Sequence, residues 1–535
     1  MTTLALRQRP VLAASIVGVG AAVLLRLARY LRRLRSAGQE VPFAPGWVPV
    51  LGHLPAIMKY AGQNNKLSLG LHAMAVREET GQSVYKIDMP MMGVALTVIS
   101  DPDLAEELSH GDPHRFTKDF GSFGSSINVM MDIMGDTGLF FAATDREDDA
   151  WGVTHRILKA PFSTKGMKNM FPVMCEQADK LVEALKRDVG YGGVTHIDKW
   201  VTKMAFETIA MCGLGISFGS FDDDKEHPFI EALNGIMCDL RTYAMCPWLL
   251  RPILCRSAYR RLQDAKSLLR GTCTEVVRQR RDHTTSAVGR GTDLMDMMLN
   301  DKDPQTGKAM TEKMIVDNVL TFLFAGQDST AAAMATCLCF LASCPDAKAR
   351  LFKEIDEVVG AGDLEWEHLS RLSYLDGCIR ETLRLVPPAS GAVRAAKGDQ
   401  LLGGKWRVAH GENALISFMA LHYDTKLWGP DAAVFRPERW VSGPPHKYAF
   451  LPFASGPRAC TGREFTLIEQ KITMVKLLQH FDFRRPAMVE AEPGYKTVKH
   501  EDLMPPLKFN IDVEFKTTTA FTGVYSAFEL LKRGN

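Results

Sequence analysis

The chain has 535 residues, of which 46% are hydrophobic and 24% are charged, so it can bury a large core, which excludes a disordered or fibrous protein. Its 64 basic and 62 acidic side chains give a formal net charge of +2, which leaves no global field for nucleic acid. The 11 cysteines include no CxxC pair and no Cys/His cluster with zinc spacing, and an odd number cannot all form disulfides. We therefore expect a reducing compartment, in which most of the cysteines are small buried hydrophobes.

The amino terminus has the pattern of a membrane anchor. Residues 11–25, VLAASIVGVGAAVLL, carry no charge, and five arginines follow between positions 26 and 35. The run is short for a span, but arginine stems can reach the headgroups, and the arginines behind it place the rest of the chain in the cytoplasm by the positive-inside rule. We expect residues 1–40 to form a single-pass anchor and residues 41–535 to form one domain, since no linker or repeat follows. An Arg-rich mitochondrial transit peptide is the alternative.

Helical patterns dominate the rest of the chain, apart from residues 85–100, which predict two strands joined by a Pro/Gly turn. The longest pattern, residues 311–344, predicts a helix roughly 50 Å long at 1.5 Å per residue, which must cross the core. At its centre, Gly326 costs about 1 kcal/mol relative to alanine, while Asp328 and Ser329 bring polar groups into an apolar helix. A helix bend with Asp328 turned to solvent is the ordinary explanation.

Two further segments carry charges in unusual places. In ETLRLVPP, Glu381 and Arg384 stand three residues apart on one helical face, for which an exposed ion pair is the default explanation. In FRPERW, Arg436, Glu438 and Arg439 lie among aromatics and a proline, which indicates a polar group under an irregular segment. Each signal is weak when taken separately.

The segment 453–462, FASGPRACTG, holds Cys460 between two glycines. Cys460 has three possible roles: nucleophile, structural thiol or metal ligand. A nucleophile needs a base, and the neighbourhood offers only His446, with His480 at 20 residues, and no Cys/His motif. A structural thiol does not require such a loop. A thiolate bound to haem iron does require it, because the sulfur must stay deprotonated and project from a tight turn at a fixed height.

The other residues of this loop then have roles too. Gly456 permits the turn, and Gly462 allows the following helix to approach a porphyrin closely. Phe453 shields the sulfur from water, and Arg458 pairs with a haem propionate.

With these residues, the chain resembles the cytochrome P450 family. Four family motifs occur in the family's order: A-G-x-[DE]-[TS]-T (Ala325, Gly326, Asp328, Ser329, Thr330), E-x-x-R (Glu381, Arg384), P-E-R (Pro437, Glu438, Arg439) and F-x-x-G-x-R-x-C-x-G (Phe453, Gly456, Arg458, Cys460, Gly462). Trp151 and His155 match the tryptophan and basic residue of the helix that contacts the propionates. Ser329 departs from the usual threonine, Ala454 from the usual Gly or Ser, and Thr461 from an apolar residue. The resemblance implies a mainly α fold with small β-sheets, the cytochrome P450 fold, and the cofactor haem b.

The resemblance also implies roles for these residues. Cys460 is expected to be the axial iron ligand, and Asp328 and Ser329, or Thr330 in place of Ser329, to deliver protons in a groove that Gly326 opens. We expect Glu381, Arg384 and Arg439 to form a buried structural network that braces the cysteine loop. Over the distal face we expect Phe140 or Phe141, Ala325, Ala389 and Ser390, and ordinary core packing is the alternative for the two phenylalanines.

The implied activity is that of a monooxygenase that inserts one atom of O2 into a lipophilic small molecule. Residues 303–330 and the phrase LLQHFDF resemble the fatty-acid hydroxylases of bacteria and fungi that carry a fused reductase. The stretch DMPMMGVALTV lacks the arginine and tyrosine with which the bacterial members hold a fatty-acid carboxylate. We therefore expect the substrate to be an uncharged terpenoid or polyketide intermediate of fungal secondary metabolism, and a fatty acid is the alternative. A P450 that rearranges or dehydrates its substrate without O2, and a haem sensor, are the rivals from other classes.

The chain ends at Asn535, soon after Cys460, and this leaves no length for flavin or NADPH domains. We therefore expect a separate, membrane-bound NADPH–cytochrome P450 reductase, with the anchor in the endoplasmic reticulum and the catalytic domain in the cytoplasm. A shared membrane raises the effective concentration of both proteins. Basic residues near the cysteine loop, namely Arg458, Arg463 and Lys471, can complement an acidic flavoprotein surface, although Arg458 is expected to be occupied by haem.

Overall fold

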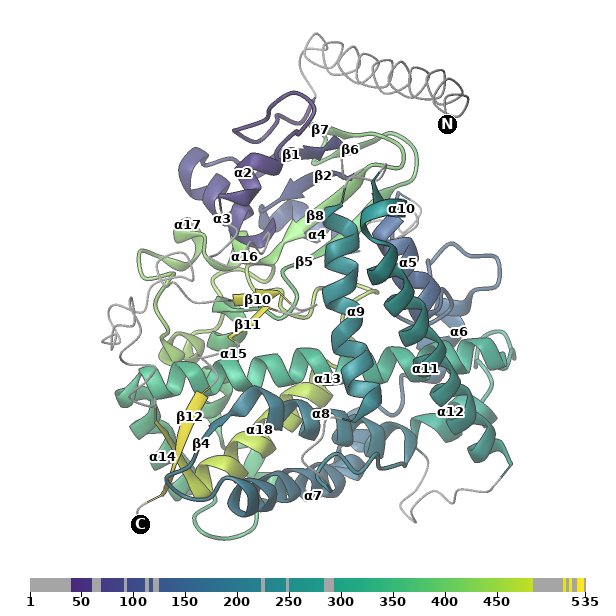
Figure 1. The fold of residues 1–535 in the computed structure, drawn as a ribbon. Coiled ribbons are helices and arrows are strands. Elements are labelled where there is room, and N and C mark those ends of the chain that lie inside the picture. Colours follow the sequence, from purple (N-terminus) through teal and green to yellow (C-terminus); the bar gives the residue numbers. More distant parts are fainter. Residues whose placement is uncertain are drawn as a thin grey trace, which may run out of the picture.

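The computed structural model describes residues 40–59, 69–90, 94–110, 115–118, 125–222, 227–246, 250–282, 293–484, 513–515, 519–521 and 527–533. The expected class, mainly α with small β-sheets, is confirmed (Figure 1). The predicted anchor, residues 1–40, lies outside the described residues except for Glu40.

Helices make up most of the described chain. In chain order the α-helices are α2 (Leu54–Met58), α3 (Leu69–Thr80), α4 (Pro102–His110), α5 (Ser125–Met134), α6 (Ala150–Ile157), α7 (Thr164–Asp188), α8 (Ile197–Leu214), α9 (Pro228–Met245), α10 (Arg251–Leu254), α11 (Arg256–Arg281), α12 (Leu294–Asn300), α13 (Glu312–Ser343), α14 (Pro345–Val358), α15 (Ser373–Leu385), α16 (Phe418–His422), α17 (Thr425–Trp428) and α18 (Arg463–His480). Two 3₁₀ helices, η3 (Trp366–Ser370) and η4 (Pro437–Val441), complete the set.

Strands β1 (Val84–Met89) and β2 (Val94–Ile99) pair antiparallel, as the pattern in residues 85–100 predicts. They belong to a five-stranded sheet of order β1-β2-β8-β5-β3, with β3 (Phe116–Thr117), β5 (Gly391–Ala396) and β8 (Asn413–Ser417). The described residues form three smaller sheets. One has the strand order β4-β12-β9, with β4 (Val194–His196), β12 (Ala527–Lys532) and β9 (Phe481–Arg484). The other two are strand pairs: β6 (Gln400–Leu402) with β7 (Trp406–Val408), and β10 (Val513–Phe515) with β11 (Thr519–Phe521). The large sheet lies at one end of the molecule and the long helices fill the other (Figure 1).

Helix α13 runs through the helical part of the molecule and is buried along most of its length (Figure 1). It begins where the hydroxyl of Thr311 accepts a hydrogen bond from the amide of Met314, and it ends before Pro345. The predicted long central helix is therefore confirmed. The role expected for Gly326 is wrong, because a Cβ at this position would lie 2.8 Å from Cγ1 of Ile209 on α8. Gly326 allows α13 and α8 to pack closely and does not open a groove.

Within the described residues, no single helix is both long and apolar enough to cross a membrane. Only the bent pair of α13 and α14, whose axes differ by 112°, meets that criterion.

Candidate functional site

The segment that carries Cys460 is a tight loop immediately before α18. The amide of Cys460 donates to the carbonyl of Phe453 over 2.9 Å, and the amide of Ala459 donates to the carbonyl of Gly456 over 2.9 Å. Gly456 has a φ of 79°, and a Cβ there would lie 1.9 Å from the carbonyl oxygen of Ser109 at the end of α4. Only glycine fits at this position, for both reasons.

The Cys460 side chain has accessible surface, and yet the surrounding protein raises the pKa of its thiol through burial. We infer from this combination that the thiol borders an opening inside the fold. The amide of Gly462 and the charges of Lys118 and Arg463 act in the opposite direction and favour the thiolate. A Cβ on Gly462 would meet only the sulfur of Cys460, at 3.9 Å, so there is room beside the sulfur.

Three cationic side chains gather near the same loop: Lys118 after β3, Arg394 on β5, and Arg458. Burial, and then the charges of Arg458 and Arg394, hold the pKa of Lys118 well below its usual range. Burial lowers the pKa of Arg394 to about 10, and burial followed by the charge of Arg394 lowers that of Arg458 to about 9. Among the described residues, neither Arg394 nor Arg458 forms an ion pair with a carboxylate. This cluster is therefore a site for an anion.

Arg458 is held by backbone carbonyls. Its guanidinium donates to the carbonyl oxygens of Ala142 over 2.8 Å, Phe140 over 3.2 Å and Leu139 over 3.3 Å. It also lies over the ring of Trp151, 5.0 Å from its centroid.

Trp151 in turn stacks on His155, with ring centroids 4.8 Å apart. Burial, and then the charges of Lys159 and Arg458, lower the pKa of His155. The structure thus brings together Arg458, Trp151 and His155, as the resemblance implies.

Glu381 and Arg384 form a fully buried ion pair on α15. Arg384 donates through Nη2 and Nε to the two carboxylate oxygens of Glu381, over 2.7 Å and 2.9 Å, and both side chains are 0% exposed. Glu381 also accepts from Nε of Arg439 over 3.3 Å, from the amide of Arg436 over 3.1 Å and from the indole of Trp440 over 3.0 Å. The Glu381–Arg384 pair is therefore part of a buried, hydrogen-bonded network and is not the exposed ion pair that is the default explanation for this spacing.

This network is tied to the cysteine loop through His422 on α16. Nδ1 of His422 donates to the carbonyl of Arg384 over 2.9 Å, and Nε2 accepts from the amide of Leu451 over 2.9 Å. Leu451 is buried two residues before Phe453. Burial lowers the pKa of His422 to about 3, so the ring is neutral and keeps this acceptor.

The hydroxyls on α13 point to different neighbours. Ser329 donates to the carbonyl of Ala325 over 2.8 Å, and Ala325 is exposed beside it, while Asp328 is half-buried. Thr330 is buried, and its hydroxyl lies 2.7 Å from that of Thr466 on α18. Thr330 therefore faces α18 and does not lie with Ser329.

The residues expected over the distal face separate into core and lining. Phe141 is 2% exposed and belongs to the hydrophobic core, which is the ordinary alternative. Phe140 is 39% exposed, and the Lys118 ammonium lies 4.1 Å from its ring centroid, so Phe140 adjoins the cation cluster. Ala389 is exposed, and Ser390 is half-buried where its carbonyl accepts from the amide of Phe418.

Two of the three basic residues near the cysteine loop, Arg458 and Lys471, make contacts within the fold. Arg458 faces inward, and Lys471 is 15% exposed and pairs with Asp376 over 3.0 Å. Of these three, only Arg463 points outward near the loop, where it is 53% exposed and lies 3.7 Å from Glu464. The inward position of Arg458 agrees with the expected haem contact, and the expectation of a docking role is wrong for Lys471, which is largely buried in its ion pair.

Comparison with known proteins gives the family. The profile described as Cytochrome P450 matches residues 42–513. The chain belongs to the cytochrome P450 family. It is 31% identical over 464 residues to Self-sufficient cytochrome P450 monooxygenase CYP505E3 of Phanerodontia chrysosporium, which covers 85% of this chain and 41% of that protein. It is 32% identical over 393 residues to Bifunctional cytochrome P450/NADPH–P450 reductase ALT2 of Alternaria alternata, covering 72% and 34%. This P450 chain thus spans well under half the length of these relatives.

The residues of this P450 fit haem b, the family's cofactor. The Cys460 thiol keeps accessible surface, and the absent Cβ of Gly462 leaves room beside it. The buried Arg394 and the half-buried Lys118 and Arg458 suit two propionate carboxylates. Sequence analysis found Arg458 but missed Lys118 and Arg394. An arginine in the apolar strand GAVRAA was a usable signal for Arg394, whereas nothing near Lys118 in the sequence marks it.

Proposed function

We propose that this P450 is a monooxygenase that inserts one oxygen atom of O2 into a lipophilic small molecule. The observation that carries the proposal is the loop of Cys460, whose thiol keeps accessible surface near the cations Lys118, Arg394 and Arg458. When bound, haem supplies the redox chemistry that activates O2. The chain contributes Cys460 as the proposed axial ligand, with its charge supported by the Gly462 amide and Lys118.

Proton delivery is proposed to run through Asp328 and Ser329. Ser329 lies one turn after the exposed Ala325 and donates to its carbonyl, and Asp328 is half-buried beside it. Asp328 is near enough to solvent to exchange protons, and the hydroxyl can pass one inward. The Thr466 contact of Thr330 supports leaving Thr330 out of this route.

We propose that the electrons come from an NADPH–P450 reductase in a separate chain, and that residues 1–40 anchor this P450 in the endoplasmic reticulum membrane. A reductase as the electron donor is supported by the names of the relatives, one of which is a bifunctional P450 and NADPH–P450 reductase with both activities in one chain. The separate chain is the part of the proposal that the experiment with added reductase tests. The anchor is supported by exposed apolar side chains on α10, where Ile253 is 76% and Leu254 64% exposed. Figure 1 draws α10 toward the same end of the molecule as β7, with which the first described residue, Glu40, forms a β-bridge through Arg407.

The test is turnover with isotopically labelled O2. The purified protein, a P450 reductase and NADPH are incubated with a panel of uncharged terpenoids and polyketides and, in parallel, of fatty acids. We expect one labelled oxygen atom in a product from the uncharged set. Labelled fatty acids alone would support the fatty-acid alternative. An unlabelled, rearranged or dehydrated product without NADPH, or no product from any set, would contradict a monooxygenase.

A further inference from the structure

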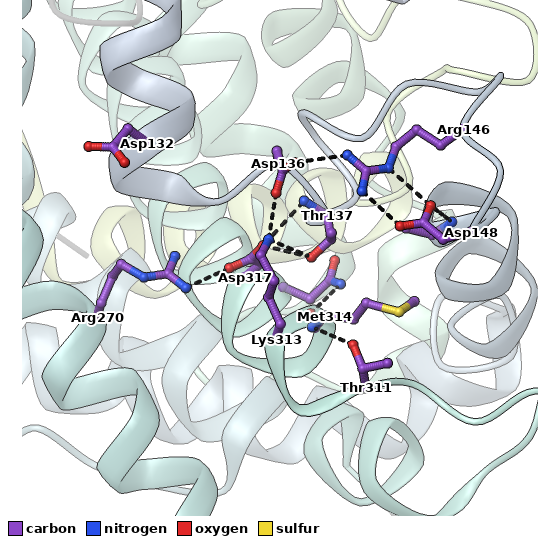
Figure 2. A network of polar contacts seen from close by, with 12 residues as sticks. Asp132, Asp136, Thr137, Arg146, Asp148, Arg270, Thr311, Lys313, Met314 and Asp317 are labelled. Carbon is purple, nitrogen blue, oxygen red and sulfur yellow. Dashed lines mark hydrogen bonds and ion pairs between the residues drawn. The ribbon is translucent and has the colours of Figure 1, made fainter.

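Asp317, one turn before Thr321 on α13, is a fully buried carboxylate with partners from three elements (Figure 2). It accepts from the Thr137 hydroxyl over 2.6 Å, the Thr137 amide over 3.2 Å and the Lys313 ammonium over 2.8 Å, and it pairs with Arg270 of α11 over 2.9 Å. A buried carboxylate is costly unless it is paired and hydrogen-bonded in this way. Neither the haem site nor the proton route described above uses this group.

The partner segment, residues 135–142, lies with its backbone directly on α13. A Cβ on Gly135, whose φ is 90°, would lie 2.0 Å from Cγ of Asp317, and one on Gly138 would lie 2.6 Å from the hydroxyl of Thr321. The amide of Leu139 donates to Oδ1 of Asn318 over 2.8 Å. No side chain fits between this loop and the helix, so Asp317 and Asn318 fix the position of its backbone.

The same loop holds Arg458 at its other end. The three carbonyl groups that accept from the Arg458 guanidinium belong to Leu139, Phe140 and Ala142. Asp317 thus connects, through one short loop, to a cation of the cluster beside Cys460. On α13, positions 317, 321, 325 and 329 are each four apart and share one face, so the anchored loop follows the face that leads to Ala325 and Ser329.

We propose that Asp317 and Asn318 are positioning residues for the haem pocket: they fix loop 135–142, whose carbonyl oxygens aim the Arg458 guanidinium at the haem edge. The proposal rests on the haem site assigned above. In this proposal Arg458 is the residue that interacts with the haem, and Asp317 and Asn318 act only by fixing the loop. If the loop shifts, the positive charge of Arg458 moves away from the haem, and the reduced state of the haem loses stabilisation.

The midpoint potential of the haem in the purified holoprotein distinguishes this role from a direct one. Removing the negative charge in Asp317→Ala would by itself favour the added electron and make the potential more positive. Displacement of the Arg458 guanidinium would instead make the potential more negative. We expect Asp317→Ala to shift the potential in the negative direction, and Asn318→Ala, which changes no charge, to shift it in the same direction.

Asp132→Ala is the matched control. Asp132 on α5 lies outside the loop, pairs with Lys266 of α11 over 2.6 Å and is 51% exposed, so the variant removes a negative charge nearby and leaves the bonds between the loop and α13 in place (Figure 2). We expect its potential to stay unchanged or become slightly more positive. In an Arg458→Lys background the shifts of Asp317→Ala and Asn318→Ala should largely vanish, because the group they position is altered.

Three results would overturn the proposal: a positive or absent shift in Asp317→Ala, an unchanged potential in Asn318→Ala, or shifts that stay additive with Arg458→Lys. If both α13 variants lose haem while Asp132→Ala retains it, the positioning role is supported in a stronger form. The measurement requires haem but no substrate turnover. A wild-type protein that holds haem and makes no product would therefore contradict the proposed function alone.

Discussion

Two neighbouring positions of the cysteine loop adopt a positive φ, 56° at Ala454 and 79° at Gly456. A left-handed conformation is unfavourable for alanine and free for glycine. We expect Ala454→Gly to raise the free energy of unfolding by about 0.5–1 kcal/mol. Gly456→Ala should lower it by more, because its Cβ would overlap the carbonyl of Ser109. Denaturant titration of the holoprotein measures both, and a destabilised Ala454→Gly protein would show that the loop geometry is wrong.

At the same scale, Ser329 and Thr330 are adjacent hydroxyls with different surroundings. Because Ser329 lies beside Ala325, Ser329→Ala should raise the NADPH consumed per product by a factor of about 10². Thr330→Val should leave this ratio near the wild-type value, since its hydroxyl meets Thr466 instead. The ratio is measured from NADPH oxidation and product in one assay. The reverse ranking of the two variants would disprove the proposed proton route.

At the scale of elements, His422 joins α15 to the segment before Cys460. Its folded-state pKa of about 3 lies below the ordinary 6.5, so between these values the unfolded chain binds the additional proton. Stability from His422 is therefore complete above about pH 6.5 and is lost as the pH falls toward 3, at about 1.4 kcal/mol per pH unit. A protonated ring cannot accept the Leu451 amide, so the cysteine loop should loosen as well.

The variants His422→Gln and His72→Gln test this. Burial also lowers the pKa of His72, to about 4, but His72 lies on α3 and belongs neither to α16 nor to the segment before Cys460. Both substitutions should flatten the acid side of the stability profile. Only His422→Gln should change the pH at which the thiolate-type haem spectrum is lost. An unaltered spectral transition in His422→Gln would contradict the link.

Local patterns predicted the elements well, and they predicted less about which face of an element meets which partner. The long helix over residues 311–344 follows from its cap and apolar run. Which neighbours Gly326 and Thr330 face depends on where α8 and α18 pack, and the helix sequence does not contain that information. The buried state of Glu381 and Arg384 was predictable only because the motif is shared with a known family.

The residues of the haem site also divide into those that the local sequence marks and those that only the fold brings together. Cys460 stands out in the sequence because its loop breaks local rules. Lys118 follows β3, Arg394 lies on β5 and His422 on α16, far apart along the chain, and each is an ordinary residue in its own segment. Only the fold brings Lys118 and Arg394 near Arg458 and ties His422 to the segment before Cys460.

At the scale of the whole molecule, the proposed reductase should be needed in every catalytic cycle. We expect no product from purified protein with NADPH and substrate until a flavoprotein reductase is added, and slower turnover as ionic strength rises. Arg463→Gln should weaken the salt dependence, because Arg463 is exposed near the loop. Lys471→Gln is the control, since Lys471 is paired with Asp376. Turnover without added reductase would contradict a separate electron donor.

The account depends most on Cys460 as the thiolate ligand of haem. The direct measurement is the carbon monoxide difference spectrum of the reduced, full-length protein, compared between wild type and Cys460→Ala. The wild type should give the red-shifted Soret band of thiolate ligation, and Cys460→Ala should lack that band even where some haem is retained. If the variant keeps the band, or the wild type never shows it, Cys460 is not the ligand and the proposed chemistry fails.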